Sequence, residues 1–256
     1  MVFHAWYFYI ILFLIFHTIY TLLFRSISKS NPHHYGIIIS TVFVFLWISG
    51  LIFSLVTGHV DFKNVLQVLP YLLIGGIIFA YANVYGSKAM GRIDVAQHTV
   101  LSVLRVVITV IASSFLLRES LNSIQILGAV LILSAVLIST FKITRRSFNI
   151  DQYSLIAILS AVLIGIAITN EKYILNYMNI QTYLIVGWGF QTFSLLLVTF
   201  KDLHNIRFFL GILRGLSGIA FVSSLISSNN SSLTSISSSF IVISVTIAAI
   251  IFLNEK

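Results

Sequence analysis

A few ionisable side chains of this sequence lie inside long apolar runs, where a charge needs a specific reason. Arg105 stands about ten residues from either end of the run 95–117, which places it near the middle of that run. At the centre of a membrane an arginine costs roughly 3 kcal/mol or more unless it is paired or faces water. Arg105 is therefore a candidate cavity cation for an anionic group of a substrate. A structural pair with helix-end carbonyl groups, or with an acid elsewhere in the chain, is the alternative.

Two histidines lie in similar surroundings. His17 is in the middle of the first apolar run, where an imidazole can relay protons near neutral pH. His98 lies in the first turns of the run 95–117, near the expected mouth of a cavity. A hydrogen-bonded packing role is the competing interpretation for both histidines.

Polar and aromatic residues in the middle of two further runs suit a partly wet cavity. Hydrogen bonding between helices explains them equally well. These candidates are Tyr81, Asn83, Trp188 and Gln191.

Two other charged positions point to the surface instead. Arg214 lies only two turns inside its run, so its side chain is expected to extend to the membrane interface. Glu171 and Lys172 end another run and are expected to form a surface pair.

The composition identifies the class of protein. Hydrophobic residues make up 58% of the 256 residues, charged residues only 9%, and the mean hydropathy is +1.02. A soluble domain carries about 25% charged residues, so the chain is predicted to be a polytopic membrane protein. The net charge of +8 does not indicate nucleic acid, because the basic residues lie mostly between the apolar runs. The chain has no cysteine, and we expect neither a metal site nor a cofactor.

Nine apolar runs are long enough to span a bilayer, which takes about 20 residues. The sequence has only two prolines, both near the ends of runs, and no period-2 alternation, so the runs are predicted to be helices. Alanine and glycine at four-residue spacing, from Ala157 through Ala161 to Gly165, predict a close-packing helix face. The nine predicted spans are 6–24, 36–56, 67–86, 95–117, 121–141, 153–171, 181–200, 207–226 and 233–253.

The two halves of the chain resemble each other. A shift of about 148 residues aligns Asn31 and Tyr35 with Asn179 and Tyr183, and further on a shift of 136 residues aligns the halves. The repeated unit has an odd number of spans, so its two copies are predicted to lie inverted in the membrane. The second copy stops where its fifth span is expected, so we interpret it as lacking a tenth helix. The pairs at the shift of 136 are Gly75 with Gly211, Ser102 with Ser238, Ala112 with Ala248 and Glu119 with Glu255.

Basic residues between the runs predict the orientation. Ten lie on one side of the predicted membrane and three on the other, which places the N-terminus outside and the midpoint linker in the cytoplasm. The ten are Arg25, Lys29, Lys88, Arg92, Lys142, Arg145, Arg146, Lys201, Arg207 and Lys256, and the three are Lys63, Arg118 and Lys172.

Nearly the whole chain resembles the EamA-like family of the drug/metabolite transporter superfamily. The most specific part is Leu116-Leu117-Arg118-Glu119-Ser120-Leu121, followed by Gln125 and Gly128. The segments Ala80-Tyr81-Ala82-Asn83-Val84-Tyr85 and Phe252-Leu253-Asn254-Glu255-Lys256 strengthen the match. Glu119 and Glu255 lie at tight turns next to helix starts, so for them, and for Gln125 and Gly128, we expect a structural role.

The resemblance implies an all-α fold of two inverted five-helix repeats around a central cavity, here with nine spans because the second repeat lacks its last helix. The expected parts are a first repeat at 1–141, a cytoplasmic linker at 142–152 and a second repeat at 153–256. The implied function is a secondary transporter or exporter of a small metabolite, for which Arg105 suggests an anionic or zwitterionic solute. A proton or another coupling ion and a second copy of the chain, forming a homodimer, are candidate partners besides lipid.

Two alternatives remain at this point. One keeps the fold but makes the chain a non-catalytic membrane subunit, such as a partner of a lipid-carrier flippase. The other is an intramembrane enzyme, but the sequence contains no His-Glu-x-x-His pair and no Gly-x-Ser-x-Gly turn. It also contains no phosphate-binding Gly-x-x-x-x-Gly-Lys-Ser/Thr loop, so we do not expect ATP hydrolysis by this chain.

The orientation can be tested at the linker. A tag inserted next to Ser147 should be unreachable by an impermeant reagent in intact cells and reachable after permeabilisation, because the basic residues around it favour the cytoplasm. Labelling in intact cells would show that the charge count gives the wrong orientation.

Overall fold

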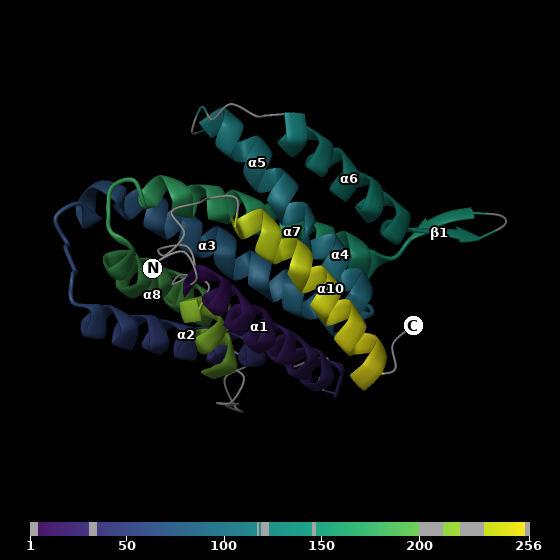
Figure 1. The fold of residues 1–256 in the computed structure, drawn as a ribbon, viewed down its shortest axis with the longest axis horizontal. Coiled ribbons are helices and arrows are strands. Elements are labelled where there is room, and N and C mark those ends of the chain that lie inside the picture. Colours follow the sequence, from purple (N-terminus) through teal and green to yellow (C-terminus); the bar gives the residue numbers. More distant parts are fainter. Residues whose placement is uncertain are drawn as a thin grey trace.

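The computed structural model describes residues 5–30, 35–116, 118, 123–144, 147–199, 212–220 and 233–253. In these residues the chain forms a bundle of helices with a small β hairpin projecting from one end (Figure 1). All nine predicted spans contain helix wherever they are described. The helices are α1 (Ala5–Ser30), α2 (Tyr35–Thr57), α3 (Val65–Met90), α4 (Val95–Ser102), α5 (Leu104–Leu116), α6 (Ser123–Thr140), α7 (Gln152–Ile174), α8 (Ile180–Thr199), the segment 212–220 and α10 (Leu233–Leu253).

Within the described residues, six helical stretches are long and apolar enough to cross a membrane. Two shorter apolar stretches, Ile126–Ile138 and Phe240–Leu253, lie in α6 and α10. Large apolar side chains cover the outside of the bundle, with exposed fractions as high as 81% for Leu66 and Phe115. Such a surface would be unstable in water and suits lipid, so the prediction of a multi-pass membrane protein is confirmed.

The fourth predicted span is not one continuous helix. It divides into α4 and α5 at Val103, where the N–H of Val103 bonds to the carbonyl of Val100 at 3.2 Å and the N–H of Val106 to that of Val103 at 2.9 Å. These bonds join residues three apart, so the chain is locally tightened without proline or glycine. Arg105 follows this break directly, which makes the neighbourhood of Arg105 the irregular part of the span.

The linker between the two halves is more regular than the sequence suggested. Strands β1 (Phe141–Thr144) and β2 (Ser147–Ile150) pair antiparallel, with Phe141 opposite Ile150 and Thr144 opposite Ser147. β-Branched and aromatic residues favour strands, and here they outweigh the polar character of the segment. The hairpin connects α6 to α7.

The antiparallel contact between α3 and α7 depends on small residues. Ser160 Oγ donates to the carbonyl of Ala82 at 2.7 Å, and Asn170 Nδ2 donates to the carbonyl of Tyr71 at 2.9 Å. A side chain can reach a carbonyl of a neighbouring helix only where the two backbones are close. On the same helix Ala157, Ala161 and Gly165 are buried, which confirms the predicted packing face.

Helices α2 and α8 also run antiparallel and are joined by side chains that bond to backbone carbonyls. Trp47 Nε1 donates to Ile185 O at 2.8 Å, and Thr192 Oγ1 donates to Phe43 O at 3.1 Å. Nearer the end of α2, Ser54 Oγ donates to Gln181 O at 3.0 Å.

Two further contacts complete the bundle. Helix α1 lies beside α10, and the hydroxyls of Thr18 and Ser244 bond at 2.9 Å (Figure 1). The segment 212–220 packs on α2, because a Cβ at Gly215 would lie 2.6 Å from Ser49 Oγ and one at Gly218 would lie 3.0 Å from Leu46.

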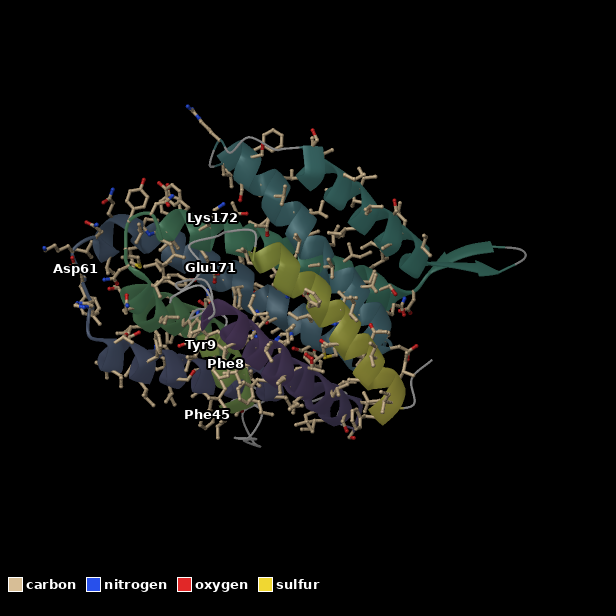
Figure 2. All side chains as sticks on the ribbon, viewed as in Figure 1. Phe8, Tyr9, Phe45, Asp61, Glu171 and Lys172 are labelled. Atoms are coloured by element: carbon tan, nitrogen blue, oxygen red, sulfur yellow. The ribbon has the colours of Figure 1, made fainter. Side chains whose placement is uncertain are left out.

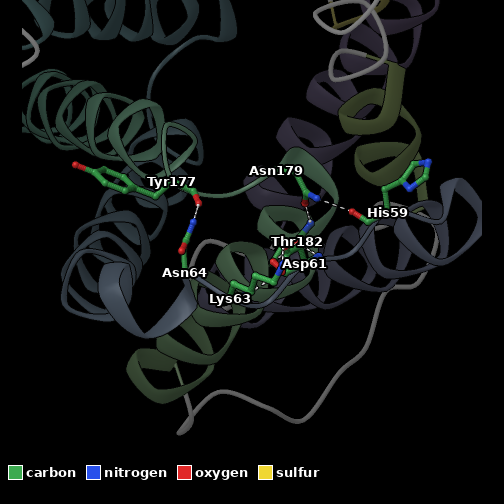
Figure 3. Close-up of polar contacts among 7 residues, drawn as sticks. All are labelled: His59, Asp61, Lys63, Asn64, Tyr177, Asn179 and Thr182. Atoms are coloured by element: carbon green, nitrogen blue, oxygen red, sulfur yellow. Dashed lines mark hydrogen bonds and ion pairs between the residues drawn. The ribbon is translucent and has the colours of Figure 1, made fainter.

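At the end of the bundle away from the hairpin, the α2–α3 loop is bonded to the α7–α8 loop (Figure 3). Thr182 Oγ1 donates to Asp61 O at 3.0 Å and accepts from the N–H of Asp61 at 2.9 Å. Asn64 Nδ2 donates to Tyr177 O at 2.7 Å, and Asn179 Nδ2 donates to the carbonyl of His59. We call these contacts the loop latch.

The packing of α5 on α7 gives a prediction at Gly165. A Cβ there would lie 2.6 Å from Ile108 Cβ and 2.9 Å from the backbone oxygen of Arg105. Gly165→Ala should therefore lower the melting temperature of the purified protein, by an overpacking cost of about 1–3 kcal/mol.

Gly128→Ala is the matched control, because no described atom lies within 4 Å of a Cβ at Gly128. Alanine is a better helix former than glycine by roughly 0.5–1 kcal/mol, so this variant should keep or slightly raise the melting temperature. Equal effects of the two substitutions would contradict the close contact of α5 and α7.

Candidate functional site

A buried polar group occupies the space between α3, α7 and α8. Gln191 Nε2 donates to Glu171 Oε1 at 2.6 Å and to Tyr183 Oη at 2.9 Å, and the hydroxyl of Tyr183 bonds to the carboxylate of Glu171. Gln191 is only 5% exposed and Tyr183 6%. Figure 2 shows Glu171 within the helical bundle, whereas Asp61 lies in the loop at its end.

A small cavity adjoins this polar group. Three glycines make the room: a Cβ at Gly187 would overlap the ring of Tyr183, one at Gly75 would overlap the amide of Asn170, and one at Gly76 would lie 2.9 Å from Ser194 Oγ. The three glycines therefore let Tyr183, Asn170 and Ser194 pack close to the helix backbones around the cavity. Its lining is Leu72, Gly75, Gly76, Ala167, Asn170, Glu171, Ile174, Tyr183, Gly187 and Gln191.

A second polar group joins the segment 212–220 to α1. Arg214 Nη1 lies 3.3 Å from His17 Nδ1, and its guanidinium carbon lies 5.7 Å from the centre of the Tyr20 ring. A guanidinium has no acceptor, so Nδ1 of His17 accepts this hydrogen bond and the imidazole is neutral. The contact with Tyr20 has the geometry of a cation–π interaction.

Electrostatic interactions link Arg214 to Glu171 and to Arg105. The charge of Arg214 interacts with those of Glu171 and Arg105, and both arginines interact electrostatically with His17. We call Arg105, Arg214, Glu171 and His17 the charge cluster. Two cations and one anion leave it with one excess positive charge.

The four side chains of the charge cluster are half-buried. Among them, Glu171 lines the small cavity. A charge that keeps part of its surface accessible has a lower desolvation cost than a fully enclosed one.

The other candidates named from the sequence have local partners. His98 Nε2 lies 3.2 Å from the carbonyl of Gly86. Asn83 Nδ2 donates to Phe79 O of its own helix at 2.8 Å. Tyr81 is 44% exposed and its ring lies 6.3 Å from that of Tyr85. A substrate contact at these three residues stays a prediction.

Trp188 is packed between helices. A Cβ at Gly50 would lie 2.6 Å from Cε3 of Trp188, and one at Gly218 would lie 3.3 Å from its Cη2. The indole therefore fills the space that two glycines leave on α2 and on the segment 212–220.

The family-motif positions lie at the edge of what the structure describes. Glu119 and Glu255 are outside the described residues, and Gln125 lies in α6 without a described side chain. Gly128 lies in α6 with open space around it. The expected structural role of these four positions stays a prediction.

Two expectations from the sequence were wrong. Arg214 does not extend to the interface, because His17 and Tyr20 hold its guanidinium inside the bundle. Glu171 is not a surface residue, because Gln191 and Tyr183 bond to its carboxylate between three helices. Both were judged by their distance along the helix to its end, whereas burial depends on which face of the helix they occupy. Gln191, a polar residue in the middle of the apolar α8, was the sequence feature that could have indicated a buried polar partner such as Glu171.

Among the described residues, no group of three or more His, Cys, Asp or Glu side chains could hold a metal ion.

The fold and the charge cluster define a multi-pass membrane protein with an ionic interior. The EamA-like transporter family matches residues 4–141, more than half of the chain, so the chain belongs to that family and to the drug/metabolite transporter superfamily. Its members are membrane transporters of small solutes. No curated protein sequence matches the chain.

The hydrogen bonds of Gln191 give a prediction for stability. Gln191→Leu removes a donor from a buried carboxylate, and an unsatisfied buried group costs about 1–3 kcal/mol. We expect a lower melting temperature than for the wild type.

Thr192→Val is the matched control, since Thr192 is the next residue, is 3% exposed and donates only to a helix carbonyl. It should cost less than Gln191→Leu. A loss at Gln191 no larger than that at Thr192 would show that Glu171 does not depend on the amide.

Proposed function

We propose that this chain is a secondary transporter of a small metabolite with an anionic or zwitterionic group, working by alternating access of two inverted repeats. The charge cluster carries the proposal. Its members come from both halves of the chain, since His17 and Arg105 precede the linker and Glu171 and Arg214 follow it. An anionic group bound between the arginines would balance the excess positive charge of the cluster.

The contacts between helices support the inverted repeats. We pair α1 with α7, α2 with α8, α3 with the segment 212–220, and α4 and α5 with α10. Under this pairing the contact of α1 with α10 corresponds to that of α7 with α4 and α5. The contact of α3 with α7 corresponds to that of the segment 212–220 with α1, where Arg214 meets His17.

The central pair fits the same relation. Helices α2 and α8 contact each other and run antiparallel. A two-fold axis in the membrane plane reverses the direction of a helix, so equivalent helices on the axis would cross antiparallel. We accordingly propose repeats at 1–141 and 153–256, joined by 142–152.

The loop latch supports alternating access, because hydrogen bonds of the α2–α3 loop to Tyr177, Asn179 and Thr182 join the two proposed repeats at one end of the bundle. Beneath it lies an apolar cluster that includes Val68, Met178 and the cavity-lining residues Leu72, Ile174 and Tyr183. Together they would close the cavity toward that end. The charge count places this end outside the cell.

Arg105 gives the test of this function. Arg105→Leu should keep the protein folded and lower the initial rate of solute uptake into liposomes at least about tenfold, which is about 1.4 kcal/mol. Arg105→Lys should keep part of the rate, because lysine retains the charge but not the planar fork. The solutes are those that raise the melting temperature of the wild type in a metabolite screen.

Lys29→Leu is the control, since it removes an exposed cation from the end of α1 and should leave uptake unchanged. Normal uptake by a well-folded Arg105→Leu variant would refute the assignment of Arg105. A folded wild type that binds and moves none of the solutes would favour the non-catalytic subunit instead.

A further inference from the structure

We propose that Glu171 is a proton-binding site, and that its proton is taken up together with an anionic group at Arg105 and Arg214. The first part stands on the geometry around Glu171 alone. The second part rests on the proposed function, because it uses the two arginines as the anion site.

Glu171 has the position that an exchangeable proton requires. It is the only acidic residue in the described parts of the helices that span the membrane. Its carboxylate borders the small cavity between α3, α7 and α8. The carboxylate therefore adjoins internal space rather than lipid.

The groups around the carboxylate disfavour a metal ion, and burial in the bundle favours the neutral acid. The two nearest polar groups, the amide N–H of Gln191 and the hydroxyl of Tyr183, both donate to it. Donors leave a cation few oxygen ligands, whereas a metal such as sodium, calcium or magnesium needs several. From α3 only the uncharged Leu72, Gly75 and Gly76 line the cavity.

Arg214 supplies the link to the anion site. It is the cation whose charge interacts with Glu171, it contacts His17 and Tyr20 on α1, and it interacts with Arg105. With Glu171 ionised the cluster has one excess positive charge, and with Glu171 protonated it has two. An anion is attracted more strongly in the second case.

Linkage then requires the reverse effect. If the proton strengthens anion binding, the bound anion strengthens proton binding by the same factor. Proton and anion would therefore enter the interior together, so the coupled process is symport. A cationic solute would instead compete with the proton at Glu171.

Infrared difference spectroscopy of the purified protein in liposomes tests the proton site without any solute. The sequence has only seven Asp and Glu residues, so the carboxylic acid band of one buried side chain can be assigned. The wild type should gain this band reversibly as the pH is lowered, and Glu171→Gln should lack it. Absence of any band that depends on Glu171 would overturn the proposal.

Tyr183→Phe provides a second test that does not depend on whether Glu171→Gln folds. It removes the hydroxyl that bonds to the carboxylate, so the acid band should move in frequency while remaining present. A band that is unchanged in Tyr183→Phe would belong to another residue and would also overturn the proposal.

The coupling is tested with acetate as the anion, glycine as the zwitterion and methylammonium as the cation. In the wild type the apparent dissociation constant of acetate should rise with pH through the range where Glu171 ionises, by at most about tenfold per pH unit for one linked proton. Glu171→Gln should bind acetate without this dependence. The same pH dependence in Glu171→Gln, or tighter binding of methylammonium than of acetate, would refute the coupling.

The outcomes separate the two proposals. If acetate and glycine do not bind but the Glu171 band titrates, the anion site of the proposed function fails and the proton site stands. If acetate binds and the band is missing, the proton site fails and the anion site stands.

Discussion

Arg214 carries a charge inside the helical bundle, where desolvation of a charged side chain has a high free energy. The polar contacts at the centre of the bundle compensate for this desolvation. A lone arginine in a bilayer interior needs a partner or water. Here Arg214 contacts His17 and Tyr20 on α1 and interacts with Glu171 on α7. Glu171 in turn depends on Gln191 and Tyr183 on α8. One cation thus connects three helices, and it does so across the linker that separates the two halves.

Such a centre is possible because the surrounding helices approach closely. Glycines at 75, 76 and 187 make room for Asn170, Ser194 and Tyr183, and Gly165 lets α7 lie against α5. Hydroxyl and amide side chains then reach the carbonyls of neighbouring helices, as Ser160 does at Ala82. In a lipid environment these contacts hold helices together without a hydrophobic driving force between them. They stabilise the positions of the charges as well as the fold.

The sequence predicted the architecture better than the site, for a physical reason. Apolar runs locate helices because span length is set by the bilayer, and each of the nine predicted spans contains helix where it is described. No proline or glycine marks the break at Val103 in the sequence, so α4 and α5 were predicted as one helix. Arg105 was chosen as a candidate because its charge lies far from both ends of its run, and its role stays a prediction. Glu171 and Arg214 were misplaced because distance to a helix end says nothing about which face meets the interior.

Under the proposed alternating access, the two halves separate at the loop latch during each transport cycle. The chain has no cysteine, so a pair introduced by His59→Cys and Asn179→Cys, on opposite sides of the latch, can be joined by a cleavable thiol cross-linker. Each single variant, treated in the same way, controls for the substitution itself. The account predicts that solute uptake stops in the cross-linked pair and returns when the linker is cleaved. Full uptake by completely cross-linked protein would contradict it.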